Sequence, residues 1–292
     1  MNQSDKAGKL KVADAMARIT FLGTGGGRFV VINQLRASGG WVLEMDGEML
    51  HVDPGPGALI RAKEFGINLK NVTGILVSHA HTDHCTDCEM IVEAMTCGSR
   101  EKKGVVVGNV NVIRGGEKYR PAFSPYHLKS VERYEILKAG DVTRIGKLEV
   151  TATPTSHGEE EGIGFVISGE ARIGYTSDGE YFRGQEKYFE GCNILLVNCL
   201  RPRNDEWPKH MSSEQAAELI SKVSPGIAVL KHFGRKMLNG VAEEEAAWIE
   251  KETGIRTIAA RDGMVLEISS GGVEVSRPGK PEVKGNPGKF LG

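Results

Sequence analysis

Residues 79–84, HAHTDH, place three histidines and one aspartate within six positions. Imidazole nitrogen and carboxylate oxygen are both good ligands for Zn²⁺ and comparable divalent transition metals. The motif directly follows the apolar run 74–78 (GILVS), so we expect it on a loop that joins a buried strand to a helix. A single histidine there would more often be a surface residue, whereas the pattern H-x-H-x-D-H indicates a metal site.

The periodicity of the rest of the chain predicts the elements that position this motif. Short β-rich runs predict strands, and stretches with apolar residues at helical spacing predict helices between them. Their mixed order, with hairpins beside strand–helix units, predicts an α/β layered domain. The predicted strands are 17–22, 41–45, 48–53, 74–78, 104–108, 147–154, 164–168, 172–176, 193–198, 227–232 and 264–268. The predicted helices are 56–65, 86–97, 213–223 and 242–252, the third of them capped by Ser212 or Ser213.

The composition is that of a globular protein without a general attraction to polyanions. The 292 residues carry a formal net charge of −1, and no stretch approaches the ~18 consecutive apolar residues of a membrane span. The N-terminus lacks the layout of a secretory signal, and five cysteines favour free thiols in a reducing compartment. We therefore expect a cytoplasmic protein with no membrane partner. We also expect a flexible N-terminus (1–16), a single domain (17–269) and a flexible C-terminal tail (270–292).

Three more candidate ligands follow apolar runs later in the chain: His157 in TPTSHG, Asp178 in YTSDGE and His232 in VLKHFG. Together with HAHTDH, this ordered set resembles the metallo-β-lactamase superfamily over about residues 17–268. The resemblance implies a four-layer αββα sandwich and two divalent metal ions, with Zn²⁺ expected first and Mn²⁺ or Fe as alternatives. It implies that His79, His81 and His157 hold one metal, that Asp83, His84 and His232 hold the other, and that Asp178 bridges them.

Asp53, in HVDPGPG, lies at the end of another predicted strand and resembles the first motif of the same superfamily. This resemblance implies that it accepts a proton from a ligand imidazole and fixes the tautomer of that ring. The alternative is an aspartate that only stabilises a Pro-Gly turn.

Two segments, FLGTGGGR (21–28) and 210–234, resemble the branch that contains the transfer-RNA 3′-processing endonucleases and the phosphoribosyl cyclic phosphodiesterases. Both groups cleave phosphodiesters, which here implies hydrolysis by attack of a metal-bridging hydroxide. His210 is then a non-ligand histidine that can protonate the leaving alkoxide, and it joins Asp83 as a predicted catalytic residue. The alternative for His210 is a residue that merely precedes a helix.

The spacing of the later motifs bears on the substrate. The long endonucleases insert an RNA-gripping arm between the histidine and the bridging aspartate, whereas here His157 and Asp178 are only 21 residues apart. With the near-neutral charge, this favours a small cyclic or single-stranded nucleic-acid phosphodiester, such as a cyclic nucleotide or RNA. Family likeness also predicts a homodimer.

Two other classes of function stay open at this point. One is a thioester or lactone hydrolase, or a mononuclear-iron persulfide dioxygenase, of the same superfamily. The other is a nucleic-acid-binding scaffold without catalysis. The glycine cluster 23–27 favours the phosphodiesterase, because its backbone N–H groups could approach an anion, although a glycine-rich loop is also simply a tight turn after a strand.

Several further residues have an ordinary structural interpretation beside a functional one. Cys85, Cys88 and Cys97 could be half of a zinc site, but we favour buried thiols behind the metal loop. The basic segment 98–135 could present a nucleic-acid or dimer surface, and its aromatic residues could line a pocket or pack under a loop. Glu243–Glu245 are expected to be solvated at a helix start. The side chains that could clamp phosphate, or simply be solvated, are Arg28, Arg201, Arg203, Arg235 and Lys236.

Overall fold

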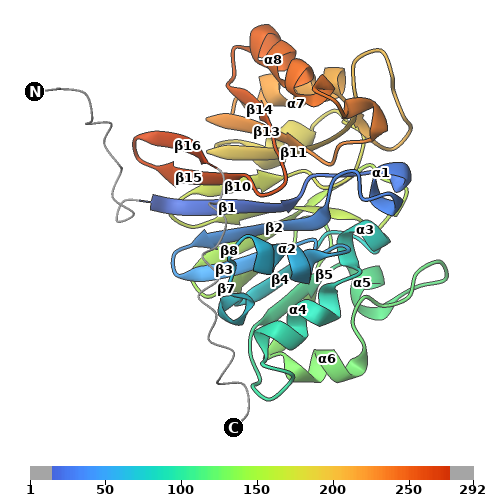
Figure 1. The fold of residues 1–292 in the computed structure, drawn as a ribbon, viewed down its shortest axis with the longest axis vertical. Coiled ribbons are helices and arrows are strands. Elements are labelled where there is room, and N and C mark those ends of the chain that lie inside the picture. Colours follow the sequence, from blue (N-terminus) through green and yellow to red (C-terminus); the bar gives the residue numbers. More distant parts are fainter. Residues whose placement is uncertain (1–14, 277–292) are drawn as a thin grey trace, which may run out of the picture.

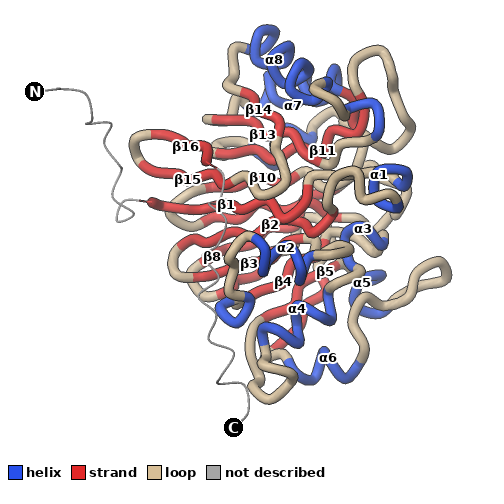
Figure 2. The backbone as a smooth tube through the Cα atoms, viewed as in Figure 1, coloured by secondary structure: helices blue, strands red, loops and turns tan. Residues whose placement is uncertain are grey.

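Two mixed β-sheets pack face to face in the computed structural model, which describes residues 15–276 (Figures 1 and 2). Helices cover the outer face of each sheet, so the predicted four-layer αββα sandwich is confirmed. Most strands carry apolar side chains on both faces, and each face therefore needs a partner layer. None of the helices in the described part of the chain is long and apolar enough to cross a membrane.

The first sheet is antiparallel at one end and parallel at the other. β3, β4, β5 and β6 pair in parallel, so their carboxyl ends meet at one edge. That edge receives the loops that begin at Asp53 and Ser78. In spatial order the strands are β16 (Gly272–Ser276), β15 (Val265–Ser269), β1 (Ala15–Gly23), β2 (Ser38–Met45), β3 (Glu48–Val52), β4 (Gly74–Val77), β5 (Val105–Gly108) and β6 (Arg133–Ile136).

The second sheet brings three more loops to the same side of the molecule. β10, β11, β13 and β14 are parallel, and β8 runs in the direction of β10 because both are antiparallel to β9. The loops after β8, β10 and β13 carry His157, Asp178 and His232. The strand order is β14 (Thr257–Ala259), β13 (Ile227–Lys231), β11 (Ile194–Arg201), β10 (Arg172–Tyr175), β9 (Ile163–Ser168), β8 (Leu148–Pro154) and β7 (Val142–Ile145), with β12 (Met211–Ser212) paired to β11.

Three apolar clusters bind the layers together, one between the sheets and one under each helical layer. Burial of this apolar surface supplies the main favourable term in folding. In Figure 1, α7 and α8 lie at the top of the molecule, and α4 and α6 lie in its lower part. The helices are α1 (Arg28–Ile32), α2 (Ala58–Glu64), α3 (Thr82–Cys85), α4 (Cys88–Met95), α5 (Val110–Arg114), α6 (Pro125–Ser130), α7 (Ser213–Val223) and α8 (Val241–Thr253). Short 3₁₀ turns lie at η2 (Leu69–Asn71), η3 (Gln185–Phe189) and η4 (Arg235–Met237).

Helix α7 shows why the sequence forms a helix here. Its apolar positions recur at helical spacing and are buried against the second sheet. Ser212 is the N-cap residue, but its hydroxyl donates to the carboxylate of Glu214 (2.9 Å) and not to a backbone group. Ser224 ends the helix in the left-handed conformation (φ 50°).

The terminal boundaries differ from the predicted ones. The predicted tail begins at residue 270, whereas Gly272–Ser276 form β16, which pairs with β15 and packs Val273 against the core between the sheets. Likewise β1 begins at Ala15, inside the predicted N-terminal segment. The remainder of both segments, 1–14 and 277–292, lies outside the described residues.

Candidate metal centre

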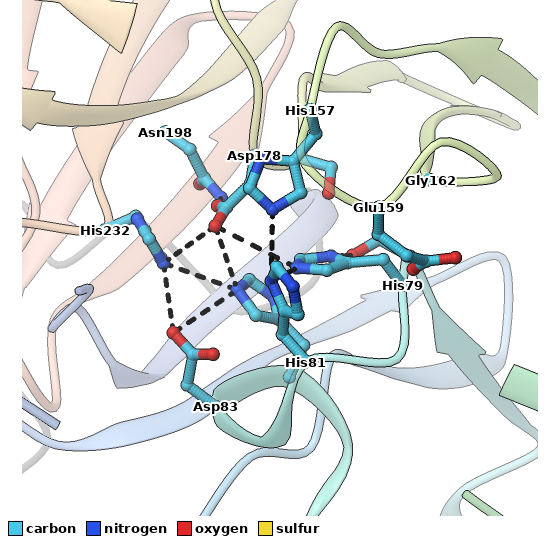
Figure 3. A network of polar contacts seen from close by, with 12 residues as sticks. His79, His81, Asp83, His157, Glu159, Gly162, Asp178, Asn198 and His232 are labelled. Atoms are coloured by element: carbon cyan, nitrogen blue, oxygen red, sulfur yellow. Dashed lines mark hydrogen bonds and ion pairs between the residues drawn. The ribbon is translucent and has the colours of Figure 1, made fainter. Parts of the chain in front are cut away.

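The seven predicted ligand side chains meet at the edge where the loops of both sheets converge (Figure 3). His79 and His81 follow β4, and Asp83 and His84 lie in α3, whose N-cap is His81. The other three come from the second sheet, after β8, β10 and β13. Residues separated by up to 153 positions in the sequence thus face one another because the strands of both sheets end on one side of the sandwich.

The first group consists of His79, His81 and His157, whose ligand atoms could hold one ion. His81 presents Nδ1, which lies 3.0 Å from Nε2 of His79 and 3.1 Å from Nε2 of His157. His79 and His157 are buried, and His81 is partly exposed. Three ring nitrogens therefore surround one point that solvent reaches from one side.

The second group consists of Asp83, His84 and His232. Nε2 of His84 lies 3.3 Å from Nε2 of His232, and Oδ2 of Asp83 lies 3.4 Å from the latter. The side chain of Asp83 is 18% exposed, whereas those of the two histidines are 3% and 4% exposed. This group therefore also has one accessible side.

Asp178 lies between the two groups. Its Oδ2 is 3.3 Å from Nε2 of His232, 3.5 Å from Nε2 of His84 and 4.0 Å from Nε2 of His79. Its Oδ1 accepts a hydrogen bond from the Asn198 amide (2.7 Å). One carboxylate oxygen can thus serve both groups, while the other oxygen is held by the protein.

The hydrogen bonds of the imidazoles test whether a metal fits. The carbonyl of Lys209 accepts from Nδ1 of His157 (3.0 Å), so Nε2 of that ring bears a lone pair. The Ser78 hydroxyl donates to Asp53, so it accepts from Nδ1 of His79, and Nε2 of His79 also bears a lone pair. Both lone pairs point toward Nδ1 of His81, at 3.0 and 3.1 Å, and a single Nδ1–H cannot be directed straight at both of them. A divalent metal ion fits this donor set.

Asp53 lies behind the second group and contacts one of its imidazoles. Its Oδ2 accepts from Nδ1 of His84 (2.9 Å) and from the Tyr175 hydroxyl (2.7 Å). Its Oδ1 accepts from the backbone N–H of Ser78 (2.7 Å). These donors outweigh burial, which by itself would raise the pKa of Asp53, and they hold that pKa below its ordinary value.

The surroundings of the imidazoles and carboxylates in the site shift their pKa values. Burial and the neighbouring His84 hold the pKa of His79 well below its ordinary value, and burial with His157 lowers the pKa of His81 to about 4. Burial would raise the pKa of Asp178, but His232 and His84 hold it well below the ordinary range. The neutral rings of His79 and His81 and the ionised Asp178 are in the protonation states that bind a cation. His84 differs, because burial opposes its positive charge but Asp178, Asp83 and Asp53 prevail and raise its pKa well above the ordinary value, so a metal ion would displace a proton from this ring.

His210 lies at the rim of the cluster. Its Nε2 is 3.6 Å from Oδ2 of Asp178, and its ring centre is 4.9 Å from that of His157. Burial opposes a positive charge there, but Asp178 prevails and raises the pKa of His210. The residue precedes β12, which leads into α7, so it does precede a helix, and the loop turns its ring toward the metal cluster.

The glycine cluster packs against the site instead of offering a free anion cradle. A Cβ at Gly26 would lie 2.3 Å from Nδ1 of His232, so only glycine fits beside that ring. The N–H groups of Gly25 and Gly26 already donate to the carbonyls of Ala37 and Phe233. The expectation that these two N–H groups meet an anion is therefore wrong.

Sequence reasoning missed three polar residues beneath the site: Glu159, Tyr175 and Asn198. All three are buried. Tyr175 and Asn198 end apolar strand runs, which is a weak signal for a functional side chain. Glu159 is the first glutamate of the run GEEEG (158–162), whose composition suggests a solvated turn.

The cysteines and the aromatic segment follow their structural interpretations in most respects. All five cysteines are free, no metal-ligand group within residues 15–276 contains one, and Cys88 is fully buried. Burial raises the pKa of Cys85 to about 12. Phe123 is buried under the first sheet, whereas the hydroxyl of Tyr119 lies 3.4 Å from Nε2 of His81 and reaches the site.

Four of the five candidate phosphate clamps have partners within the protein: Arg201, Arg203, Arg235 and Lys236. Arg201 pairs with Asp205 and stacks on Trp207, which is 52% exposed. Arg203 stacks on Trp248 and pairs with Glu245, so the expectation of a solvated Glu245 is wrong, because this carboxylate is only 5% exposed.

Comparisons with known proteins agree with this geometry. A family model described as the beta-lactamase superfamily domain matches residues 49–233. An uncharacterized protein of Methanocaldococcus jannaschii is 39% identical over 256 residues, which is 87% of this chain and 96% of that protein. Ribonuclease Z of Methanopyrus kandleri is 23% identical over 287 residues, 85% of this chain and 96% of the enzyme.

Among solved structures, the metallo-beta-lactamase fold protein YhfI of Bacillus subtilis matches with a TM-score of 0.71 and 20% identity, over 85% of this chain and 98% of that one. Fold, family model and relatives all agree. The chain belongs to the beta-lactamase superfamily, whose fold implies that divalent metal binds among these histidines and aspartates.

Proposed function

We propose that this protein is a dinuclear metal-dependent phosphodiesterase that acts on a small cyclic or single-stranded nucleic-acid phosphodiester, with Zn²⁺ as the first candidate metal. The observation that carries the proposal is the position of Asp178. Its Oδ2 lies within 3.3–4.0 Å of nitrogens from both histidine groups, as a carboxylate shared by two ions would. The ligands are His79, His81, Asp83, His84, His157, Asp178 and His232.

Two divalent ions, when bound, lower the pKa of a water molecule and neutralise charge on a phosphoryl oxygen. The chain's own residues then handle the remaining protons. His210 is 20% exposed at the rim and is held toward Asp178, so its imidazolium can donate a proton to the leaving alkoxide. Asp83 is the more exposed of the two ligand carboxylates, and it would hold an ion of the second group.

The phosphodiester class is supported by the likeness to ribonuclease Z and by His210. The topology of the second sheet supports a small or single-stranded substrate. The hairpin of β9 and β10 fills the interval between His157 and Asp178, with only residues 169–171 between its strands. This interval leaves no room for an RNA-gripping arm, which favours a substrate that is bound only by residues around the metal centre.

Metal analysis combined with a substrate screen tests the proposal. The protein, purified with its metals, should contain two divalent ions per chain and should hydrolyse bis(p-nitrophenyl) phosphate and cyclic or single-stranded phosphodiesters. One iron per chain together with oxygen-dependent turnover of a persulfide would contradict it. Faster turnover of thioesters or lactones than of any phosphodiester would also contradict it.

Two predictions accompany this function. The homodimer rests on family likeness, and sedimentation of the purified protein checks it. The cytoplasmic location rests on the free thiols, and fractionation of cells that express the protein checks it.

A further inference from the structure

Glu159 is a buried carboxylate two residues after the ligand candidate His157. Only 1% of the Glu159 residue is exposed, whereas the adjacent Glu160 and Glu161 are exposed. A carboxylate is rarely buried without partners, because desolvation strongly disfavours the charge. Its contacts therefore show what the residue is for.

The partners of Glu159 are N–H groups from the other side of the site. Oε2 accepts from the backbone N–H of Ala80 (2.8 Å), and Oε1 accepts from the amide of Asn111 (2.7 Å). The amide of Asn109 donates to both oxygens (3.1 and 3.3 Å) and also to the carbonyl of Ser78 (3.2 Å). These donors lie in the loop after β4 and at the start of α5, next to the first sheet, while Glu159 lies in the loop after β8 of the second sheet.

Ala80 is the residue between His79 and His81. The hydrogen bond from the N–H of Ala80 to Glu159 holds in place the peptide that links the two histidines, and so holds the separation of their imidazoles. A second link runs beside it, because the N–H of Ile163 donates to the carbonyl of Ser78 (3.0 Å). The loop 155–163 is thus fastened to the loop 78–81, and all three nitrogens of the first metal group lie on these two loops (Figure 3).

We propose that Glu159 is a positioning residue that joins the two loops of the first metal group and sets the geometry of His79, His81 and His157 for the metal. The inference rests on the metal centre of the proposed function. It assigns a role to a residue that contacts neither metal nor substrate.

Zinc affinity is the measurement that tests this role. In competition with a chromophoric chelator, Glu159→Ala should weaken binding of one of two Zn²⁺ ions by about 10–100-fold, as is usual for loss of a residue that orients a ligand. Glu159→Gln should lose less, because one amide oxygen can still accept from Ala80 while its –NH₂ faces the donor amides of Asn109 and Asn111. The matched control Glu160→Gln alters an exposed neighbour and should bind as the wild type does.

A second readout separates positioning from simple folding support. The visible spectrum of the Co²⁺-substituted protein should change in Glu159→Gln and in Asn111→Ala, and excess metal should restore kcat without a change in KM. If both Glu159 variants keep wild-type Zn²⁺ affinities and Co²⁺ spectra, and only the metal-free melting temperature falls, the inference is wrong. If the wild type itself binds no divalent metal, the proposed function fails first.

Discussion

In three of the ligand imidazoles, a hydrogen bond to the nitrogen that points away from the centre determines which nitrogen points into it. His79, His84 and His157 each donate Nδ1–H, to Ser78, Asp53 and the Lys209 carbonyl respectively. His81 is turned the other way, with Nδ1 inward and Nε2 near the Tyr119 hydroxyl. The protein thus decides which lone pair is available before any metal arrives.

His81→Ala and Asp178→Ala should abolish hydrolysis of bis(p-nitrophenyl) phosphate. The first removes a ligand from one group, and the second removes the oxygen shared by both. The matched control is His127→Ala, whose imidazole pairs with Glu89 and Glu93 away from the site, and it should keep full activity. The test is to measure the steady-state rate and the metal content of each variant. Undiminished turnover in both site variants would contradict the mechanism.

His210→Ala should depend on the leaving group. Loss of a general acid costs about 10²–10⁴-fold where the alkoxide needs a proton, and far less where a nitrophenolate leaves unaided. Comparing kcat/KM for an alkyl phosphodiester with that for bis(p-nitrophenyl) phosphate checks this. Equal losses on both substrates would instead make His210 a substrate-binding residue.

At the scale of elements, the site is built from sharp turns at strand ends. Asp53, Ser177 and His232 all have left-handed backbone conformations, with φ of 52°, 57° and 60°. Such conformations cost non-glycine residues of order 1–3 kcal/mol each, and they persist only where the surroundings fix them. Here they turn the chain so that side chains from successive loops face one centre.

Tyr175→Phe should loosen the contact between the sheets beneath the site. Its hydroxyl donates to Asp53 of the first sheet (2.7 Å) and accepts from Asn198 of the second (3.2 Å). Phenylalanine keeps the ring packing on Trp41 but removes this link, so the free energy of unfolding should fall by about 1–3 kcal/mol. Urea unfolding of the metal-free protein measures it, and Tyr126→Phe, at an exposed position, should change little.

His51 in β3 should make stability depend on pH. Burial lowers its pKa to about 4, while Nε2–H donates to the carbonyl of Gly39 (2.9 Å). Between that value and the ordinary 6.5, the unfolded chain binds a proton that the folded chain does not, so stability falls as the pH falls through this window. The loss approaches about 3 kcal/mol at pH 4.

Comparison with His51→Gln isolates this contribution, because glutamine keeps a donor for Gly39 but does not titrate. Unfolding free energies measured from pH 7 to pH 4 should diverge, with the wild type losing more. Parallel curves would show that His51 is protonated equally in both states.

At the scale of the whole molecule, each metal group takes ligands from both sheets. His79 and His81 of the first sheet meet His157 of the second, and Asp83 and His84 meet His232. Bound ions would therefore tie the two halves of the sandwich together. Ligands that bind only the native state stabilise it by mass action.

At a free metal concentration of ~100 times Kd, each bound ion adds about 3 kcal/mol to the free energy of unfolding, and removing the metals should take this contribution away. Urea unfolding with and without a chelator measures the difference. In Asp178→Ala the difference should shrink, because both sites lose the shared ligand. An identical unfolding curve with and without chelator would contradict metal bridging of the sheets.

The sequence by itself determined the layered fold, most strands, the four longer helices and all seven ligand candidates. These features are encoded locally. The periodicity of apolar residues predicts strands and helices, and ligand-type residues directly after a predicted strand indicate the edge of the sheet where a site forms. Where the local signal is weak, prediction failed. The exposed strand β6 and the short helices α1, α5 and α6 have little period to read, and β16 lies in a Gly- and Lys-rich segment.

Only the tertiary structure decided which residues support the site. Glu159 reaches Ala80, and Tyr175 reaches Asp53, across the interface between two sheets that are far apart in sequence. Glu159 is indistinguishable by composition from the exposed Glu160 beside it. Register and sheet packing place one carboxylate against buried N–H groups and leave the next in solvent, and no period along the chain encodes that difference.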